Sequence, residues 1–319
     1  MSEHPQHSDQ RPEEGPLHEP EVGQTPTGAA AGAGQEAASA SSLWSDAWYE
    51  LKRSPLFIAS AVLILLMITM AVFPQLFTNA SPTVQDLSRS LETPSREHWF
   101  GFDVLGRDYY ARTIYGARAS IAVGVLVVGG ATLIAVVFGS LAGYYGGAVD
   151  AVIARATDVI FAIPLILGAI VLLTVLPRRN VWTVAGVIAL FAWPTMLRLM
   201  RSAVLPVAES DYVMAARALG ASDVRILRRH ILPNALTPVV VYATIFVGVI
   251  IVAEAALTFL GVGLRPPAIS WGLMISQAQD RLLQAPHLLF FPGLFLSATV
   301  FGFILMGDAL RDALDPKLR

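Results

Sequence analysis

Six long apolar runs alternate with shorter polar segments along this chain. They lie near residues 56–78, 118–143, 151–174, 180–202, 236–262 and 288–308. Each run has the length of about 20 residues that a helix needs to cross the hydrocarbon core of a bilayer. The pattern therefore predicts an all-α integral membrane protein with six transmembrane helices. Gly139 and Gly143, inside the second run, have the spacing of small residues that favours close helix packing.

The polar segments divide the chain into parts with different expected roles. Residues 1–43 are rich in Gly, Ala, Ser and Pro and contain almost no large apolar side chains. Such a segment cannot bury enough surface to offset its ordering entropy, so we expect a disordered tail. The first span falls within residues 44–78, an extracytoplasmic segment follows at 79–116, residues 117–308 contain the other five spans, and residues 309–319 form a C-terminal tail.

Basic residues predict the orientation of the spans. Lys52 and Arg53 precede the first run, six arginines lie between residues 198 and 229, and three basic residues follow the last run. An even number of spans places all three groups on one side, and the positive-inside rule makes that side cytoplasmic. We therefore expect both termini in the cytoplasm of a multi-pass cell-membrane protein. This orientation places the basic residues Arg178 and Arg179 on the extracytoplasmic side, against the rule.

Composition excludes several classes of function. Of the 319 residues, 55% are hydrophobic and 14% charged, with a mean hydropathy of +0.58. The net charge of −2 offers no basic surface for nucleic acid, and no cysteine is present to ligate a metal or act as a nucleophile. The only lysines, Lys52 and Lys317, do not follow a glycine as a phosphate-binding loop requires. We expect no enzyme activity, no cofactor and no metal in this chain, so any ATP and Mg²⁺ would be bound by another chain.

The polar segment 207–234 is too polar to span the membrane and too regular to be a simple linker. Tyr212, Ala215, Ala216 and Leu219 have the i, i+3, i+4, i+7 spacing of one helix face. Gly220 follows where a left-handed residue commonly ends a helix. The spacing predicts a short helix that ends at a glycine turn.

A second short helix is expected after this turn. Ser222 can cap its first turn, and Val224, Leu227 and Ile231 form an apolar stripe. The dipeptide Leu232-Pro233 is expected to end it, because proline cannot continue the backbone hydrogen bonding. The resulting hairpin has two interpretations: an amphipathic structure lying on membrane lipid, or a docking element for another protein.

A resemblance favours the second interpretation. The segment Ala215-Ala216-Arg217-Ala218-Leu219-Gly220-Ala221-Ser222, continuing to His230-Ile231-Leu232-Pro233-Asn234, resembles the EAA loop of ABC-importer permeases. Three other stretches are similar to the C-type permease of dipeptide, oligopeptide and nickel importers. They are Gly101-Phe102-Asp103-Val104-Leu105-Gly106-Arg107-Asp108, the Glu254–Gly261 stretch with its downstream Pro266-Pro267 and Ser270-Trp271-Gly272, and Gly307-Asp308-Ala309-Leu310-Arg311-Asp312. The resemblance covers residues 44–319.

The resemblance implies a type I ABC-importer permease fold, with residues 117–308 as its transmembrane domain and 207–234 as a cytoplasmic coupling loop. It implies a second homologous permease subunit, two cytoplasmic ATPase subunits that bind ATP and Mg²⁺, and an extracytoplasmic solute-binding protein. ATP-driven movement of the 211–233 loop would then drive import of peptides or a related solute such as nickel. The residues matching the coupling motif are Ala215, Ala216, Leu219, Gly220, Ile231, Leu232 and Pro233.

This chain departs from the family pattern at three positions. Met214 replaces the glutamate of the EAA motif, His230 replaces an isoleucine, and Ile269 replaces a proline. The sequence Glu254-Ala255-Ala256 spells the motif but lies inside a membrane run, so it is not the coupling loop. We expect no salt bridge from position 214 to the ATPase.

Glu254 is the other candidate functional residue, because a charge inside a span is costly and is commonly functional. It could face the translocation path and meet a peptide's amino group, or it could be hydrogen-bonded between helices. A secondary transporter or channel would also use an intramembrane acid. That alternative, however, gives the 211–233 segment no role.

Overall fold

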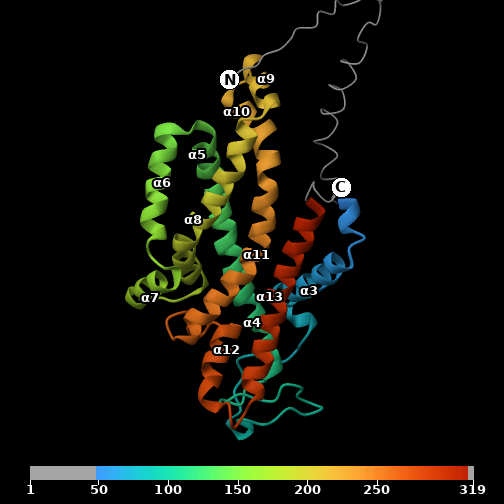
Figure 1. Cartoon of the computed structure of the whole chain (residues 1–319). Coiled ribbons are helices and arrows are strands. Elements are labelled where there is room, and N and C mark those ends of the chain that lie inside the picture. The colour runs from blue at the N-terminus through green and yellow to red at the C-terminus, as the bar shows by residue number, and fades with distance from the viewer. Residues whose placement is uncertain (1–47, 315–319) are drawn as a thin grey trace, which may run out of the picture. The chain divides into compact units, whose positions relative to one another are not determined.

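The computed structural model describes residues 48–314, and long helices dominate it (Figure 1). The predicted tail at 1–43 and the last residues, 315–319, lie outside the described residues. The helices are α3 (Pro55–Val72), α4 (Tyr109–Ile134), α5 (Ser140–Tyr145), α6 (Gly147–Phe161), α7 (Leu165–Val175), α8 (Val181–Ala208), α9 (Asp211–Ala218), α10 (Asp223–Ile226), α11 (Leu232–Phe259), α12 (Trp271–Ala278) and α13 (His287–Leu314). Two π-helical turns, η3 (Ala135–Gly139) and η4 (Leu227–Ile231), join α4 to α5 and α10 to α11.

Five of these helical segments are long and apolar enough to cross a membrane, as the sequence predicts. They are Pro55–Val72, Tyr109–Tyr145, Val181–Ala208, Asp223–Phe259 and His287–Leu314. The predicted span at 151–174 is instead a pair of helices, α6 and α7, bent by 74°. The bend falls at Pro164, which caps α7 and lacks the N–H that a continuous helix would require. The all-α membrane fold is confirmed, with the sixth span broken.

The helix ends differ from the predicted boundaries where capping residues decide them. Helix α4 begins at Tyr109 rather than near 118, because the Asp108 carboxylate accepts the Ala111 N–H at 2.8 Å. Helix α3 ends before Pro74. At the other terminus α13 continues to Leu314, so part of the predicted tail at 309–319 is helical.

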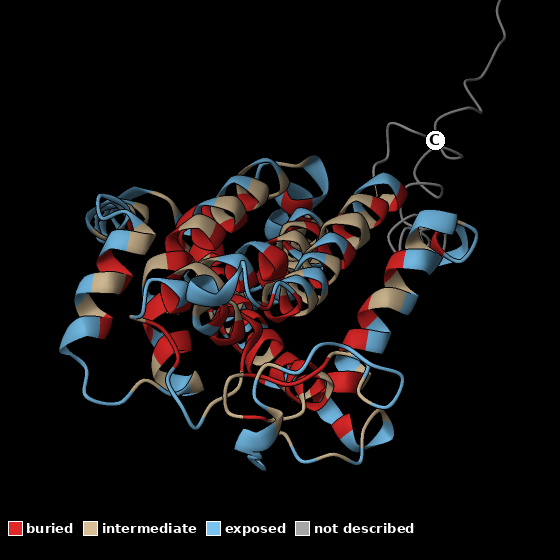
Figure 2. Cartoon of the chain, turned by 90° about the horizontal axis from the view of Figure 1, so that it is seen from below, coloured by how far each residue is buried: buried red, intermediate tan, exposed pale blue. Residues whose placement is uncertain are grey.

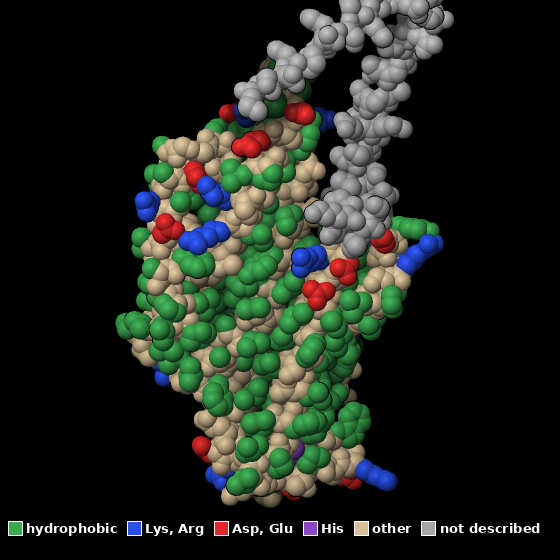
Figure 3. Space-filling view, viewed as in Figure 1, with side chains coloured by type: hydrophobic (Ala, Val, Ile, Leu, Met, Phe, Trp, Pro, Cys, Tyr) green, Lys and Arg blue, Asp and Glu red, His purple; other side chains and the backbone are tan. Residues whose placement is uncertain are grey.

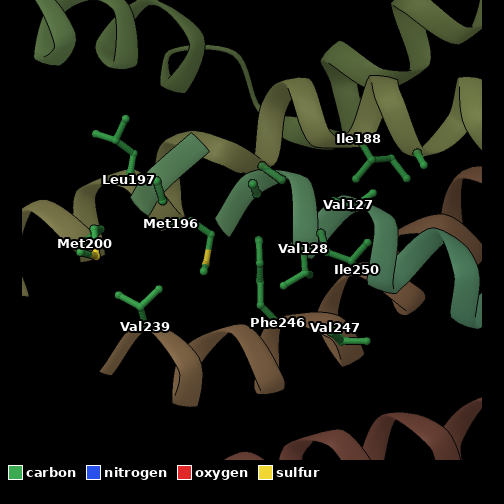
Figure 4. Close-up of a cluster of buried hydrophobic side chains, with 14 of the residues drawn as sticks. Val127, Val128, Ile188, Met196, Leu197, Met200, Val239, Phe246, Val247 and Ile250 are labelled. Atoms are coloured by element: carbon green, nitrogen blue, oxygen red, sulfur yellow. The ribbon is translucent and has the colours of Figure 1, made fainter. Parts of the chain in front are cut away.

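The hydrophobic core lies where α4, α8 and α11 meet. Its side chains come from all three helices and include Val127, Met196, Leu197 and Phe246 (Figure 4). Helix α11 also packs against α13, which packs against α3. In the apolar window of α8, 56% of the residues are buried, against 28% in those of α3 and α13. Helix α8 is therefore central and the other two are peripheral.

Much of the apolar surface of the outer helices remains uncovered. Buried residues lie towards the helix contacts and exposed ones face outward (Figure 2). On the face seen in Figure 3, charged side chains gather towards the two ends, and hydrophobic side chains cover most of the region between them. Lipid tails can cover such a band without polar partners, which is the arrangement expected of membrane-spanning helices.

At the end opposite α9 and α10, the 79–108 segment folds over the helix ends (Figure 1). Within the Gly101–Asp108 motif, the buried Asp103 carboxylate pairs with Arg107 at 2.7 Å and Arg112 at 3.3 Å. A Cβ at Gly106 would lie 1.7 Å from the Asp86 carbonyl oxygen, so the turn requires glycine. The motif is a structural turn that holds this segment against the bundle.

Helix α12 has no counterpart in the expected elements. Trp271 at its start is fully buried; its indole N–H donates to the Thr113 carbonyl at 2.9 Å, and its backbone N–H donates to the Ser120 hydroxyl at 3.1 Å. Helix α12 has only eight residues, too few to produce the long apolar signal of a span. Its packing against α11 and α13 fixes the chain between these two helices.

Candidate functional site

Helix α8 leads directly into the 207–234 segment at the end of the bundle where α9 and α10 lie (Figure 1). Ser210 separates α8 from α9, and its hydroxyl donates to the Val207 carbonyl at 2.6 Å. Asp211 at the start of α9 and Arg217 at its end complement the helix dipole. The predicted first helix is confirmed as α9.

Gly220 makes the turn between α9 and α10 possible. Its φ of +79° is in the left-handed region, as the sequence predicts. The Gly220 N–H donates to the Arg217 carbonyl, and the Ala221 N–H donates to the Ala216 carbonyl, both at 3.0 Å. This pair of bonds is the Schellman arrangement that closes a helix at a glycine.

The second helix begins after Ser222 as expected, but its predicted end is wrong. Ser222 occupies the N-cap position of α10 without a side-chain capping bond. From Asp223 the helix continues through η4 into α11 instead of ending at Leu232-Pro233. In the wider π turn, the Leu232 N–H reaches back to the Leu227 carbonyl. Pro233 then lies in the first turn of α11, where its missing N–H costs little.

The hairpin presents two different apolar faces. Val213, Ile226 and Ile231 are fully buried in the main core, together with the largely buried Leu227. These side chains fix the hairpin against α8 and α11. Val224, which the sequence places on the same apolar stripe as Leu227 and Ile231, is exposed while the other two are buried.

The outward face contains most of the predicted coupling residues. Leu219 is 89% exposed, and Tyr212, Met214 and Val224 are also exposed. Ala215, Gly220 and Pro233 are exposed as well, while Ala216 and Leu232 are half-buried and Ile231 is buried. The structure therefore exposes Ala215, Leu219 and Gly220 around the turn after α9, whereas Ile231 and Leu232 pack against the core.

Ion pairs join the first and last turns of α6 to the second half of α8. The Arg201 guanidinium makes two hydrogen bonds to the Asp150 carboxylate, at 2.5 and 2.6 Å. Asp158 pairs with Arg198 of α8 at 2.8 Å and lies 4.0 Å from Arg155 of its own helix. A two-bond arginine–carboxylate contact restricts orientation as well as distance, so α6 is held against the half of α8 that leads into the hairpin.

Glu254 lies in the other half of α11 and is fully buried. Its Oε1 accepts hydrogen bonds from Thr258 at 2.8 Å and Ser270 at 3.4 Å, which joins α11 to the residue before α12. Its Oε2 makes no hydrogen bond among the described residues. These contacts agree with a carboxylate hydrogen-bonded between elements, and the role in the pathway stays a prediction.

An open apolar groove of about 610 Å³ lies outside the core. Side chains of α4 from Tyr115 to Leu126, the first two residues of α8, and residues 267–269 line it. Glu254 is not among the lining residues. Within residues 48–314, no cluster of three or more His, Asp or Glu side chains is arranged to hold a metal ion.

The comparisons with known proteins assign this helical membrane fold to the permease subunits of ABC importers. Residues 135–319 match the family of binding-protein-dependent transport system inner membrane components, and residues 42–94 match the N-terminal transmembrane domain of oligopeptide transport permease C. The chain belongs to this family of inner-membrane, multi-pass permeases. The family description implies an ATPase, a binding protein and a partner permease, so ATP is hydrolysed by a separate subunit and this chain is not itself an enzyme.

Several curated relatives match most of the chain. The oligopeptide transport system permease protein OppC of Bacillus subtilis (strain 168) is 40% identical over 87% of this chain and 91% of its own length. The dipeptide permease DppC of Alkalihalophilus pseudofirmus is 41% identical over 86% and 90%. The glutathione permease GsiD of Pectobacterium atrosepticum is 39% identical over 86% and 92%. The similarity gives no support to a secondary transporter or a channel.

Proposed function

We propose that this subunit forms half of a translocation pathway that imports peptides. Oligopeptides, dipeptides and the tripeptide glutathione, for which the relatives are named, share a peptide backbone. This shared chemistry favours a peptide over nickel. A second homologous permease completes the pathway, and two ATPase subunits drive it from the cytoplasm.

The observation that carries this proposal is the exposed tip of the coupling loop, residues 207–234. Four large apolar side chains on it, including Leu219, face away from the bundle, although the same loop buries Val213 and Ile226. Burying one leucine contributes about 2 kcal/mol, so a protein groove that covered this tip would gain substantially. The ATPase subunit is the partner that the family supplies on the cytoplasmic side.

The same assignment proposes an orientation for the chain. The coupling loop, the start of α3 and the end of α13 lie towards one end of the bundle, and α12 and the 79–108 segment lie at the other (Figure 1). We place the first end, with both termini, in the cytoplasm. The 79–116 segment then contributes to the face that meets the binding protein.

Single cysteines test both the orientation and the docking, because the chain has no natural cysteine. Leu219→Cys should react with a membrane-impermeant maleimide in inside-out vesicles that lack the ATPase. Its labelling should fall by about tenfold once the ATPase assembles, since a covered side chain is desolvated. Labelling is read from gel shift or mass spectrometry.

Leu283→Cys is the matched control, because Leu283 is 98% exposed and follows α12 at the opposite end. It should react only in right-side-out vesicles and remain equally reactive with and without the ATPase. A Leu219→Cys variant that stayed fully labelled in an assembled, active importer would contradict the docking assignment.

A further inference from the structure

Tyr144 of α5 contacts the coupling loop on both sides of the Gly220 turn. Its hydroxyl donates a 2.7 Å hydrogen bond to Oδ1 of Asp223, the first residue of α10. The guanidinium carbon of Arg217, in the last turn of α9, lies 5.4 Å from the centre of the Tyr144 ring. Hydrogen bonds to a charged acceptor are the stronger kind, and a guanidinium at this distance is attracted to the ring.

This contact joins parts of the chain that the backbone does not connect locally. Helix α8 runs into the loop and α10 continues into α11, whereas Tyr144 and Asp223 are 79 positions apart in sequence. Tyr145, the next residue of α5, also interacts with Asp223, so within residues 48–314 the side-chain hydrogen bonds from residues 209–231 to a helix other than α8 or α11 all lead to α5. Tyr144 therefore provides a third connection, from the loop to the long helical segment Tyr109–Tyr145.

Another face of this segment is packed tightly against α8. A Cβ at Gly143 would lie 2.8 Å from the Val204 Cβ, and a Cβ at Gly139 would lie 2.9 Å from the Leu197 carbonyl oxygen. The predicted small-residue packing is thus present, and it lets the backbones approach closely. Close-packed elements transmit displacement because they have little free volume to absorb it.

We propose that Tyr144 is a positioning residue that makes α4 and α5 follow the coupling loop when the ATPase subunits move it. The proposal rests on the function proposed above. Without the hydroxyl, the loop still presents its exposed tip to the ATPase, but α10 can turn away from α5. ATP hydrolysis then continues while the movement of the helical bundle is incomplete.

The test uses the complete importer, with both permeases, the ATPase subunits and the binding protein, reconstituted in proteoliposomes. Uptake of radiolabelled dialanine or glutathione, whichever the binding protein retains, is measured together with ATP hydrolysis. In Tyr144→Phe the ring and its contact with the Arg217 guanidinium remain, and the hydroxyl is lost together with its interactions with Asp223 and Arg217. We expect peptide uptake per ATP to fall about tenfold, with hydrolysis within about twofold of the unsubstituted importer.

Two further substitutions separate the hydrogen bond from general packing. Asp223→Asn keeps an oxygen that can accept from the Tyr144 hydroxyl, so its coupling ratio should stay close to that of the natural chain. Asp223→Ala should lower the coupling ratio at least as much as Tyr144→Phe, because it removes the same bond and also the contact of Asp223 with Tyr145. The double variant Tyr144→Phe/Asp223→Ala should be no worse than Asp223→Ala alone, since the Tyr144 bond is already lost in that variant.

Tyr242→Phe is the matched control. Tyr242 is also half-buried against the main core, but its hydroxyl makes no hydrogen bond among the described residues. It should leave uptake per ATP unchanged. A Tyr144→Phe importer with the natural coupling ratio, or one in which uptake and hydrolysis fall together, would overturn the proposal. Failure of the proposed function itself would show separately, as an unsubstituted importer without ATP-dependent peptide uptake.

Discussion

At the scale of single residues, Gly220 shows how one backbone angle shapes the candidate site. A Cβ added to Gly220 would meet no atom within 4 Å, so space does not prohibit a side chain. The restriction is conformational, because its φ of +79° is unfavourable for other L-residues. Glycine is therefore required at this position by the turn and not by close packing.

Gly220→Val should reduce ATP-coupled uptake by about tenfold or more while membrane insertion remains normal. A left-handed conformation costs a residue other than glycine roughly 1–2 kcal/mol, and a β-branched one more. This cost would change the angle between α9 and α10. Uptake and insertion are compared in the same vesicles. Gly220→Asn is the control, since asparagine tolerates the left-handed backbone conformation. Uptake by the valine variant equal to that of the unsubstituted importer would contradict the requirement for a left-handed residue at this turn.

A second prediction at the residue scale concerns the role of Glu254 in substrate binding. Its Oε2 has no hydrogen-bond partner among the described residues, so a peptide's amino group could pair with it if α11 and residue 270 separate during transport. Glu254→Gln should then raise the KM of uptake for peptides with a free amino terminus. N-acetylated peptides serve as the comparison. Equal kinetics for both peptide types, with reduced thermal stability of the purified subunit, would assign Glu254 to fixing residue 270 instead.

At the scale of elements, apolar run length predicts the spans but not their breaks. The five unbroken spans follow from runs of about 20 apolar residues. The bend between α6 and α7 depends on whether neighbouring groups replace the hydrogen bond that is lost at Pro164. The length of an apolar run contains no information about such neighbours. Proline alone is ambiguous in this chain, since Pro194, Pro206 and Pro238 lie inside helices.

The coupling loop also shows that the sequence predicts local structure better than tertiary packing. The periodicity and Gly220 predict α9 and its end, because these depend on local backbone preferences. The continuation through η4 into α11 and the burial of Val213 depend on tertiary packing against α8. Tyr144 was not predicted as part of the site, since 79 positions separate it from Asp223 and no local pattern signals that contact.

At the scale of the whole molecule, the family match separates the transport unit from the first 41 residues. The two matched regions lie within residues 42–319, and the Bacillus OppC relative covers 87% of this chain and 91% of its own length. The low apolar content of residues 1–43 gives them little surface to bury against the bundle. Insertion and coupling should therefore depend on the shared region.

Deleting residues 2–40 should leave peptide uptake within about twofold of the full-length chain, because the deletion removes little surface that can be buried. The measurement is uptake per inserted transporter, with the amount in the membrane determined by an epitope tag at the C-terminus. Replacing the same residues with a Gly/Ser segment of equal length controls for the distance between the new N-terminus and Lys52. A truncated chain that inserts and assembles normally but does not transport, while the replacement does, would show that spacing from the N-terminus matters. Loss of uptake in both would assign a specific role to the natural tail sequence, because both variants lack it.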